Sequence, residues 1–221
     1  MSKILVIAPH ADDEIIGLGG TLLKHVKQGD EIYVCIVTRG KQPLFSEEFM
    51  LRLREETLNC HKQLEVKKTY FLEFPSVMLD EISRYELNGA MLDVFKEVKP
   101  QVVYIPHFGD MQKDHALVSE AAMVCVRPKY SYKIESVYAY ETLSETEWNI
   151  PHVANAFIPQ RYVDVTDYME KKIELLKCYN SQLSDFPNAR SCEAVVSLAK
   201  YRGVTVGVRS AEAFMVIREL R

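Results

Sequence analysis

The chain has 221 residues, of which 48% are hydrophobic and 26% are charged, and this balance is typical of one large globular α/β domain. Its formal net charge of -4 argues against a general nucleic-acid binder but leaves a small anionic substrate possible. The sequence has no run of about 18 apolar residues and no basic segment followed by an apolar one, so we expect a cytoplasmic protein without a membrane span or secretory signal.

Up to about residue 140, short strand-like runs alternate with amphipathic helical patterns. In chain order the pattern predicts a strand at residues 4–8, a helix at 15–27, a strand at 31–38, a helix at 47–64, a strand at 69–74, a helix at 82–98, a strand at 101–105, a helix at 115–126 and a strand at 137–140. Ser46 is the expected N-cap of the second helix. Alternation at this spacing predicts right-handed βαβ units and a mostly parallel sheet.

After residue 141 the alternation is less regular. The pattern predicts a short strand at residues 162–165, a helix at 167–182 that Thr166 would cap, a helix at 191–201 and a strand at 213–220. The chain contains no internal repeat, low-complexity tract or long linker, so we expect a single domain over residues 1–221. Its five cysteines are scattered and form no CxxC pair, which indicates free, mostly buried thiols and no cysteine zinc site.

Histidines and acids gather at two strand ends. His10, Asp12 and Asp13 follow the first strand, and Asp114 with His115 follows the fourth. In a doubly wound sheet the first strand is central, so its carboxyl end can face a loop from a neighbouring strand. Two histidines and one carboxylate make a catalytic zinc set, because a structural site would be closed by a fourth protein ligand.

Asp12 lies beside Asp13, but its side chain must leave the backbone in another direction. It could therefore act as the general base on the water that such a metal activates. Simpler interpretations remain open at this point: the acids could cap a helix, and Asp114 could do the same for the helix that follows it while also orienting His115. We interpret His25, His61 and His152 as surface or packing residues, whereas His107 lies near the site and is ambiguous.

The glycines that follow these acids do not predict a dinucleotide loop. Gly17, Gly19 and Gly20 form a GxGG spacing without the complete fingerprint, and the acids before them would repel a pyrophosphate. We expect them to let the helix pack closely on the sheet.

The segment PHADDEIIGLGGTL resembles the (A/P)HPDDE...GxGGTL signature of the PIG-L/LmbE-like zinc-dependent N-deacetylases. DMQKDH, from Asp110 to His115, resembles that family's D-x-H-x-D-H motif. Weaker matches follow in the right order: TRG after the second strand, REE in the helix after it, a lysine with SQ, and the late RG...GV..AEAF segment. The resemblance covers nearly the whole chain, and the first motif together with the DH motif is specific.

This resemblance implies a Rossmann-like, three-layer α/β fold with a mostly parallel central sheet. It also implies hydrolysis of an N-acetyl group on an N-acetylglucosamine-type sugar. Mapped residue by residue, the zinc ligands would be His10, Asp13 and His115, the general base Asp12, and the residue that orients His115 would be Asp114. The expected substrate contacts are Arg39, Arg54 and His107.

The chain departs from the family signature at two positions. Ala11 replaces the usual proline, which changes only loop stiffness. Gln112 stands where many members have a histidine, which is expected to stabilise the oxyanion. A glutamine amide still donates an N–H to an oxyanion but cannot titrate. We therefore expect the metal and the Gln112 amide to share oxyanion stabilisation, with His107 as the other possible acid.

Several features stay open from sequence alone. Two imidazoles and a carboxylate suit Fe²⁺ as well as Zn²⁺. The leading hypothesis is a cytoplasmic N-deacetylase of a small N-acetylated sugar that binds no nucleic acid, with specificity loops at residues 75–80 and 141–159. The family resemblance is compatible with a homo-oligomer. One alternative is an amidase for a larger acyl group on a sugar or thiol conjugate, which a deep apolar pocket would favour. Another is a non-catalytic module that binds a sugar or nucleotide.

Overall fold

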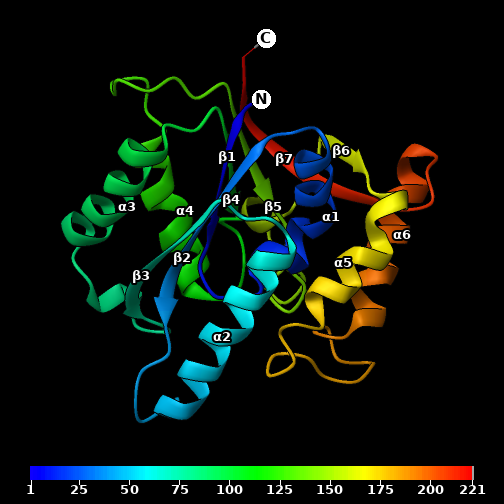
Figure 1. Ribbon diagram of the computed structural model, residues 1–221, viewed down its shortest axis with the longest axis horizontal. Coiled ribbons are helices and arrows are strands. Elements are labelled where there is room, and N and C mark those ends of the chain that lie inside the picture. The colour runs from blue at the N-terminus through cyan, green and yellow to red at the C-terminus, as the bar shows by residue number, and fades with distance from the viewer. Residues whose placement is uncertain (221) are drawn as a thin grey trace.

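The computed structural model describes residues 1–220 and contains one seven-stranded sheet in the order β3-β2-β1-β4-β5-β7-β6 (Figure 1). The strands are β1 (Lys3–Ala8), β2 (Glu31–Arg39), β3 (Lys68–Pro75), β4 (Val102–Pro106), β5 (Ser136–Tyr140), β6 (Arg161–Asp164) and β7 (Ala211–Glu219). Strands β3, β2, β1, β4 and β5 pair in parallel, and β7 is antiparallel to both of its neighbours. The prediction of an α/β fold with a mostly parallel sheet is confirmed.

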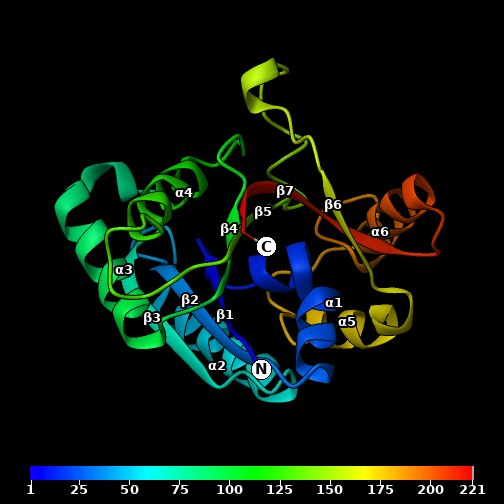
Figure 2. The same ribbon diagram turned by 90° about the horizontal axis from the view of Figure 1, so that it is seen from above.

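Helices cover both faces of this sheet (Figure 2). They are α1 (Asp13–Lys27), α2 (Glu47–Gln63), α3 (Arg84–Val98), α4 (Lys113–Cys125), α5 (Met169–Leu176) and α6 (Cys192–Val206), with short 3-10 turns η1 (Leu79–Glu81), η2 (Val153–Asn155) and η3 (Thr166–Tyr168). Alternate residues of β1 feed two cores: Leu5 and Ile7 pack with α3 and α4, whereas Ile4 and Val6 pack with α1, α2, α5 and α6. A strand that is apolar on both sides needs such a cover, which explains the three-layer architecture.

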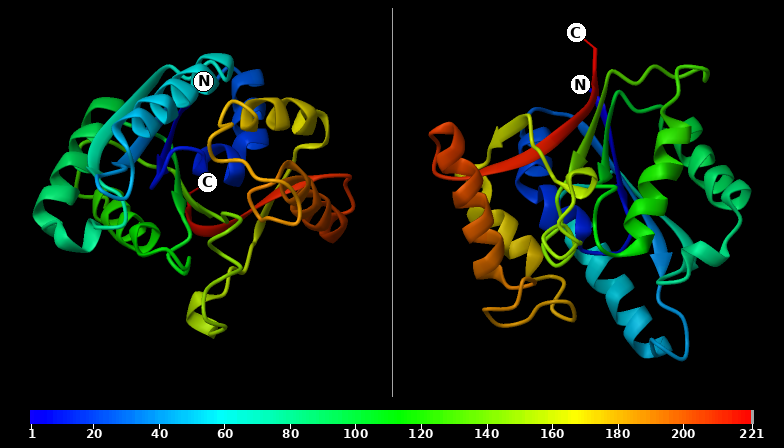
Figure 3. Two further views of the ribbon diagram at one scale, coloured as in Figure 1. Left: turned by 90° about the horizontal axis from the view of Figure 1, so that it is seen from below. Right: turned by 180° about the vertical axis from the view of Figure 1, so that it is seen from behind.

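The strand order creates a switch point between β1 and β4. From β1 the chain moves outward to β2 and β3, and then returns to place β4 on the other side of β1, where Ile4 pairs with Val102. Ligands in open α/β sheets bind at such points, outside the carboxyl ends of the strands. The loops that follow β1 and β4 therefore meet at one edge of the sheet, and α2 begins beyond this edge (Figures 1 and 3).

Most predicted elements agree with the structure to within two residues, and two differ more. The helix predicted over residues 191–201 continues to Val206 as α6. The helix predicted over residues 167–182 is only the turn η3 followed by α5, which ends at Leu176. Beyond that end Tyr179 is buried and its hydroxyl donates to Glu14 Oε1 at 2.5 Å, so a tertiary contact takes the place of further helix. The Ser46 cap is confirmed, since its side chain accepts the N–H of Phe49.

The close packing predicted for the glycines of α1 is present. A Cβ atom at Gly17 would lie 2.5 Å from the ring of Tyr140, and one at Gly20 would lie 2.8 Å from Val165. Both positions therefore need glycine because the helix lies directly on neighbouring side chains. Across residues 1–220 the structure offers no helix with the length and apolar character that a membrane crossing requires.

Candidate metal centre

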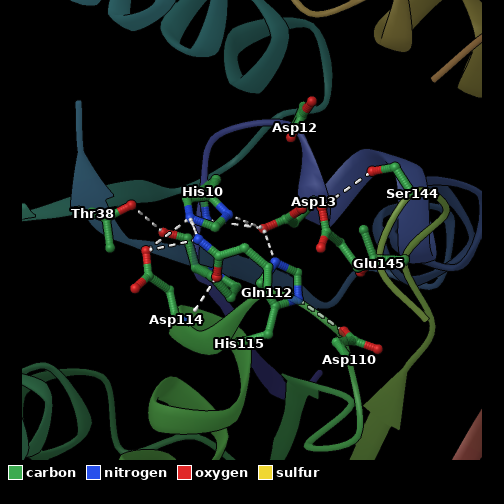
Figure 4. Close-up of polar contacts among 12 residues, drawn as sticks. His10, Asp12, Asp13, Thr38, Asp110, Gln112, Asp114, His115, Ser144 and Glu145 are labelled. Atoms are coloured by element: carbon green, nitrogen blue, oxygen red, sulfur yellow. Dashed lines mark hydrogen bonds and ion pairs between the residues drawn. The ribbon is translucent and has the colours of Figure 1, made fainter. Parts of the chain in front are cut away.

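His10 and Asp13 meet His115 at the switch point although His115 lies about a hundred residues further along the chain. One potential ligand atom from each falls within 4.8 Å of the others, and the two imidazole rings have centroids 5.3 Å apart. Figure 4 shows the three side chains turned toward one another at the ends of the β1–α1 and β4–α4 loops. Asp13 and His115 are fully buried, while a fifth of the His10 side chain is exposed.

Each histidine has one ring nitrogen held by an aspartate outside the cluster. His10 Nε2 lies 3.2 Å from Asp114 Oδ2, and His115 Nδ1 lies 2.8 Å from Asp110 Oδ2. When such a ring is neutral, the contact with the carboxylate favours the proton on that nitrogen and leaves the lone pair on the opposite nitrogen. The free nitrogens, His10 Nδ1 and His115 Nε2, both lie 3.4 Å from Asp13 Oδ2. Metal-binding histidines are usually oriented by a carboxylate in this way.

The cluster contains buried polar atoms that nothing in the chain satisfies. Asp13 Oδ1 and His115 Nε2 have no hydrogen-bond partner within residues 1–220, while Asp13 Oδ2 accepts the His10 backbone N–H at 2.9 Å. Buried polar atoms are nearly always paired, so these call for a missing partner. Two imidazole nitrogens and a carboxylate are a donor set that fits Zn²⁺ or Fe²⁺ and leaves a position open.

The charges in the cluster also point to a missing cation. Burial opposes protonation of His115, but the charge of Asp13 and the hydrogen bond to Asp110 outweigh it and raise the pKa of His115 to about 10. Burial raises the pKa of Asp13, yet the neighbouring His115 and His10 more than reverse this and hold the pKa well below its usual value. Without a metal, a proton on His115 therefore balances the carboxylates, and a divalent cation would displace it.

Asp12 occupies a strained backbone position between the two ligands of the first loop. Its φ of 102° and ψ of -27° lie on the left-handed side, which costs a non-glycine residue about 1–3 kcal/mol. The surrounding contacts hold it there: its carbonyl accepts the N–H groups of Ile15 and Ile16, and its own N–H donates to Glu14 Oε2. The strain sends the Asp12 and Asp13 side chains in different directions, as the sequence predicts.

The Asp12 carboxylate is buried and only half satisfied. Arg190 Nη1 donates to Asp12 Oδ2 at 2.5 Å, and Asp12 Oδ1 has no partner in the described part of the chain. Burial is the largest influence on Asp12 and raises its pKa to about 8, although the Arg190 charge opposes that rise. A divalent cation at the adjacent Asp13 would lower the pKa further. Asp12 thus has one oxygen without a partner in the described chain, and burial, Arg190 and any bound cation together set its pKa.

The orienting partner of His115 is Asp110, and the expectation that Asp114 fills this position is wrong. Asp114 is adjacent to His115 on α4, so the two side chains leave the helix in different directions. Its carboxylate instead contacts His10 and accepts the backbone N–H groups of Val77 and Leu79. Asp110 is fixed in turn by Thr146, whose hydroxyl donates to Asp110 Oδ1 at 2.6 Å.

Gln112, not Asp114, is the N-cap of α4. Its Oε1 accepts the Asp114 N–H at 2.6 Å, and its Nε2 donates to Asp114 Oδ2 at 3.1 Å. The Gln112 Nε2 atom also lies 3.4 Å from His10 Nε2. The amide nitrogen therefore contacts both Asp114 and His10 at the wall of the cavity described next.

A cavity of about 370 Å³ opens beside the cluster, and His10, Gln112, Glu145 and Arg190 line its inner end. Two of the predicted substrate contacts, Arg39 and Arg54, lie on its outer wall. The third, His107, is buried outside this wall, where its Nε2 donates to the Asn155 carbonyl at 2.9 Å. The cavity thus brings together two of those three residues.

Arg190 is a site residue that the sequence did not indicate, and Glu145 lies in the predicted specificity loop 141–159 without having been singled out. Arg190 lies in the connection between α5 and α6, and its Nε donates to Ser144 Oγ at 3.0 Å. Its Nη2 lies 3.8 Å from Glu145 Oε1, so one side chain bridges the segment after β5 to Asp12. No motif surrounds either residue, and only the folded chain reveals their place.

Comparisons with known proteins agree with this geometry. The sequence matches the family profile described as PIG-L, GlcNAc-PI de-N-acetylase, over residues 5–126. A diacetylchitobiose deacetylase from Thermococcus kodakarensis is 26% identical over 239 residues, which cover 98% of this chain and 84% of that protein.

Solved structures share the fold. The N,N′-diacetylchitobiose deacetylase from Pyrococcus horikoshii superposes with a TM-score of 0.79 at 24% identity, covering 98% of this chain and 84% of that one. GalB, the 4-carboxy-2-hydroxymuconate hydratase from Pseudomonas putida KT2440, has a TM-score of 0.73 at 21% identity, with 98% and 96% covered. At these identities the structures establish the fold and not the reaction. The profile match, by contrast, spans more than half of the chain and includes both loops of the metal centre, so the chain belongs to the PIG-L/LmbE family of deacetylases.

Proposed function

We propose that this protein is a metal-dependent N-deacetylase that hydrolyses the N-acetyl amide of an N-acetylglucosamine-type sugar or sugar conjugate. The observation that carries the proposal is the convergence of His10 Nδ1 and His115 Nε2 on Asp13 Oδ2, with each ring anchored from behind by an aspartate. This cluster borders a cavity large enough for a small organic ligand. The deacetylase relatives supply the class of reaction.

His10, Asp13 and His115 would hold the metal, either Zn²⁺ or Fe²⁺. When bound, the metal supplies polarisation of the amide carbonyl and a lowered pKa of the attacking water. Asp12 accepts a proton from that water through its free oxygen and returns it to the leaving amine, so that acetate and a primary amine are released. Arg190 holds the other oxygen and thereby fixes the direction of the carboxylate.

Gln112 is placed to stabilise the oxyanion that forms when water adds to the amide carbon. One of its N–H groups is bound to Asp114, and the amide borders the cavity beside His10. An amide donor at such a position typically contributes a factor of about 10²–10³ in kcat. We assign no acid role to His107, because it is buried outside the cavity wall.

The binding-module alternative predicts no need for the unpaired atoms of Asp12, Asp13 and His115. A pure sugar site would satisfy its buried polar groups within the protein, since each buried group without a partner costs about 1–3 kcal/mol. Three such atoms on adjacent side chains favour a site that is completed by a metal and a reacting group.

Metal analysis and a product assay test the proposal together. Protein purified without chelator is expected to carry zinc or iron near one per chain, and to release acetate and a new primary amine from members of a panel of N-acetylated sugars and nucleotide sugars. Removal of the metal by a chelator should stop product release, and added Zn²⁺ or Fe²⁺ should restore it. Protein that holds no metal, and takes up none when it is added, would favour the binding module.

A further inference from the structure

The cavity beside the metal centre has two chemically different ends. Its inner end carries His10, Gln112, Glu145 and Arg190. The opposite wall is formed mainly by apolar side chains from the segment before α2, from α2 itself, and from β2 and β3: Ile36, Phe45, Phe49, Met50, Leu53 and Phe71. A bare sugar offers hydroxyl groups on every edge. This wall therefore favours an apolar ligand group over a sugar edge.

The apolar wall lies only partly in the folding core: Ile36 belongs to it and Leu53 and Phe71 pack against it, whereas the two phenylalanines at the start of α2 do not. Cys60 and Leu64, at the far end of α2, pack into the core, whereas Phe45 and Phe49 are part of neither core cluster and stay half-buried. Phe49 and Leu53 lie one turn apart on the side of α2 that faces the cavity. Because α2 begins beyond the edge of the sheet (Figures 1 and 3), Phe45 and Phe49 line the cavity and lie outside both core clusters.

The wall is nevertheless held in a fixed arrangement. The rings of Phe45 and Phe49 stack with centroids 5.7 Å apart and 21° between their planes. The Phe45 ring rests on Gly40, where a Cβ atom would lie 2.7 Å from it. On the other side the Arg54 guanidinium lies 3.9 Å from the centre of the Phe71 ring. These contacts orient aromatic faces toward the cavity before any ligand arrives.

The charged groups along this wall are already paired with one another. Arg39 contacts Glu47 and Glu73, and Arg54 contacts Glu73 as well. Their charges are therefore balanced, and the hydroxyls of Thr38 and Thr57, which also line the cavity, donate to the backbone carbonyls of Pro9 and Leu53. A hydroxyl pressed against the phenylalanines would lose its bonds to water without replacement, which is unfavourable. An apolar group would instead gain by leaving water.

We propose that the substrate of this enzyme is an N-acylated amino-sugar conjugate that carries an aryl or short alkyl group against Phe45, Phe49 and Leu53. The amide and the sugar hydroxyls then lie at the polar end, near Gln112 and Arg190. The cavity volume of about 370 Å³ is near the lower limit of small-ligand pockets, so the apolar group is compact. This inference rests on the proposed deacetylase function. The apolar group can be attached through the acyl carbonyl or through the glycosidic oxygen, and the test distinguishes the two.

The test compares kcat/KM of the metal-loaded enzyme along two substrate series. One lengthens the acyl chain of glucosamine from acetyl to butanoyl and hexanoyl, and the other changes the aglycone of N-acetylglucosamine from methyl to hexyl and phenyl. Along the series that reaches the wall, each added methylene is expected to raise kcat/KM about fourfold. The series that rises identifies the point of attachment. Equal kcat/KM along both series, or a preference for the acetyl methyl glycoside, overturns the inference.

Variants assign any such preference to the wall. Phe49→Ala and Leu53→Ala should each bring the ratio of kcat/KM between the apolar and the methyl or acetyl substrate toward one. Leu51→Ala is the matched control, because Leu51 lies on the same helix and is 52% exposed on its outer side. It should leave the ratio and both rates unchanged. A wall variant that lowers kcat/KM equally for every substrate indicates a merely structural role and overturns the inference. Phe45→Ala repeats the test if a helix variant does not fold.

A binding measurement distinguishes failure of the proposed deacetylase function from failure of the inference about the apolar wall. If the metal-loaded enzyme cleaves nothing in either series, the proposed deacetylase function fails in this form. Calorimetric binding of the phenyl and methyl glycosides, and of hexanoyl and acetyl glucosamine, still tests the wall. Tighter binding of the apolar member in wild type, lost in Phe49→Ala, supports it, and equal affinities in both pairs overturn it.

Discussion

Two clusters of buried charge lie against α1, and they differ in how completely their atoms are paired. In the first, Lys172 donates to Glu212 Oε1 at 2.7 Å and to the Ile16 carbonyl at 2.8 Å, while the two Glu212 oxygens accept the N–H groups of Gly20 and Thr21. Every charged group there has a partner from the chain. In the second, the metal centre, buried oxygens and a ring nitrogen have none.

The difference separates a structural ion pair from a functional site. The Lys172–Glu212 pair connects α5 and β7 to the backbone of α1, and its neighbours on the chain complete it. In the metal centre, aspartates outside the cluster hold both histidines, and the potential ligand atoms of His10, Asp13 and His115 converge beside a cavity. Burial and charge are common to both clusters, so unpaired atoms that converge are the feature that identifies the site.

Replacing a metal ligand should have the largest effect. His115→Ala removes one of three protein ligands, so the purified variant is expected to contain no stoichiometric zinc or iron and to show no activity above background. Elemental analysis and the amine-release assay measure both. His25→Ala is the matched control, because His25 pairs with Asp30 away from the site and should retain full metal content. Normal metal content in His115→Ala would contradict the assigned ligand set.

The next largest effect is expected at the proposed general base. Asp12→Asn keeps the shape of the side chain and removes its ability to take a proton, so kcat should fall by about 10²–10⁴-fold with the metal retained. Steady-state kinetics together with metal analysis separate this from loss of the metal. An unchanged kcat in a fully loaded variant would exclude Asp12 from proton transfer.

A change in the Lys172–Glu212 pair should lower the stability of the fold and leave metal binding intact. Lys172→Met leaves Glu212 as a buried charge without its counter-ion, and such a change typically destabilises a protein by about 3–5 kcal/mol. Denaturant unfolding measures this, and the metal content per folded chain should stay normal. Lys171→Met provides the control, because Lys171 is the exposed neighbour and pairs only with Glu174. Loss of metal from folded Lys172→Met would mean that the two clusters are not independent.

A smaller effect is expected at Gln112. The variant Gln112→Ser keeps a residue that can cap α4 but removes the amide, so kcat should fall by about 10- to 1000-fold while the metal stays bound. Gln112→Ala should give the same fall in kcat with a further loss of stability, because the N-cap is also removed. If both variants turn over at the wild-type rate, the amide has no part in stabilising the oxyanion.

The smallest effect is expected at Asp110, which holds the metal ligand His115 in place. Asp110→Asn weakens the anchor of His115 without touching the cluster, and the metal affinity should fall by about 10–100-fold. Titration with a metal-buffered competitor measures the change. Asp30→Asn removes a similar contact, 2.8 Å from His25 Nδ1, and should leave the affinity as in wild type. Equal affinities for Asp110→Asn and wild type would show that Asp110 does not tune the centre.

Much of the metal centre is predictable from local sequence. The apolar run before His10 predicts a buried strand, and the dense acids after it predict charged groups at the strand end. The DH pair follows the fourth strand in the same way. Ser46 could be recognised as a cap because capping involves residues only three positions apart. Each of these features depends on neighbours in the chain, so the sequence alone specifies it.

The partners of these residues were decided by the tertiary structure. Asp110 rather than Asp114 orients His115 because the direction in which each side chain leaves α4 fixes its contact, and adjacency in sequence does not. Arg190 reaches Asp12 across 178 positions, and α2 presents Phe49 to the cavity only because it starts beyond the sheet edge. Hydrogen bonds and packing act over a few ångströms in space, so contacts between distant segments exist only once the order of the strands has brought those segments together.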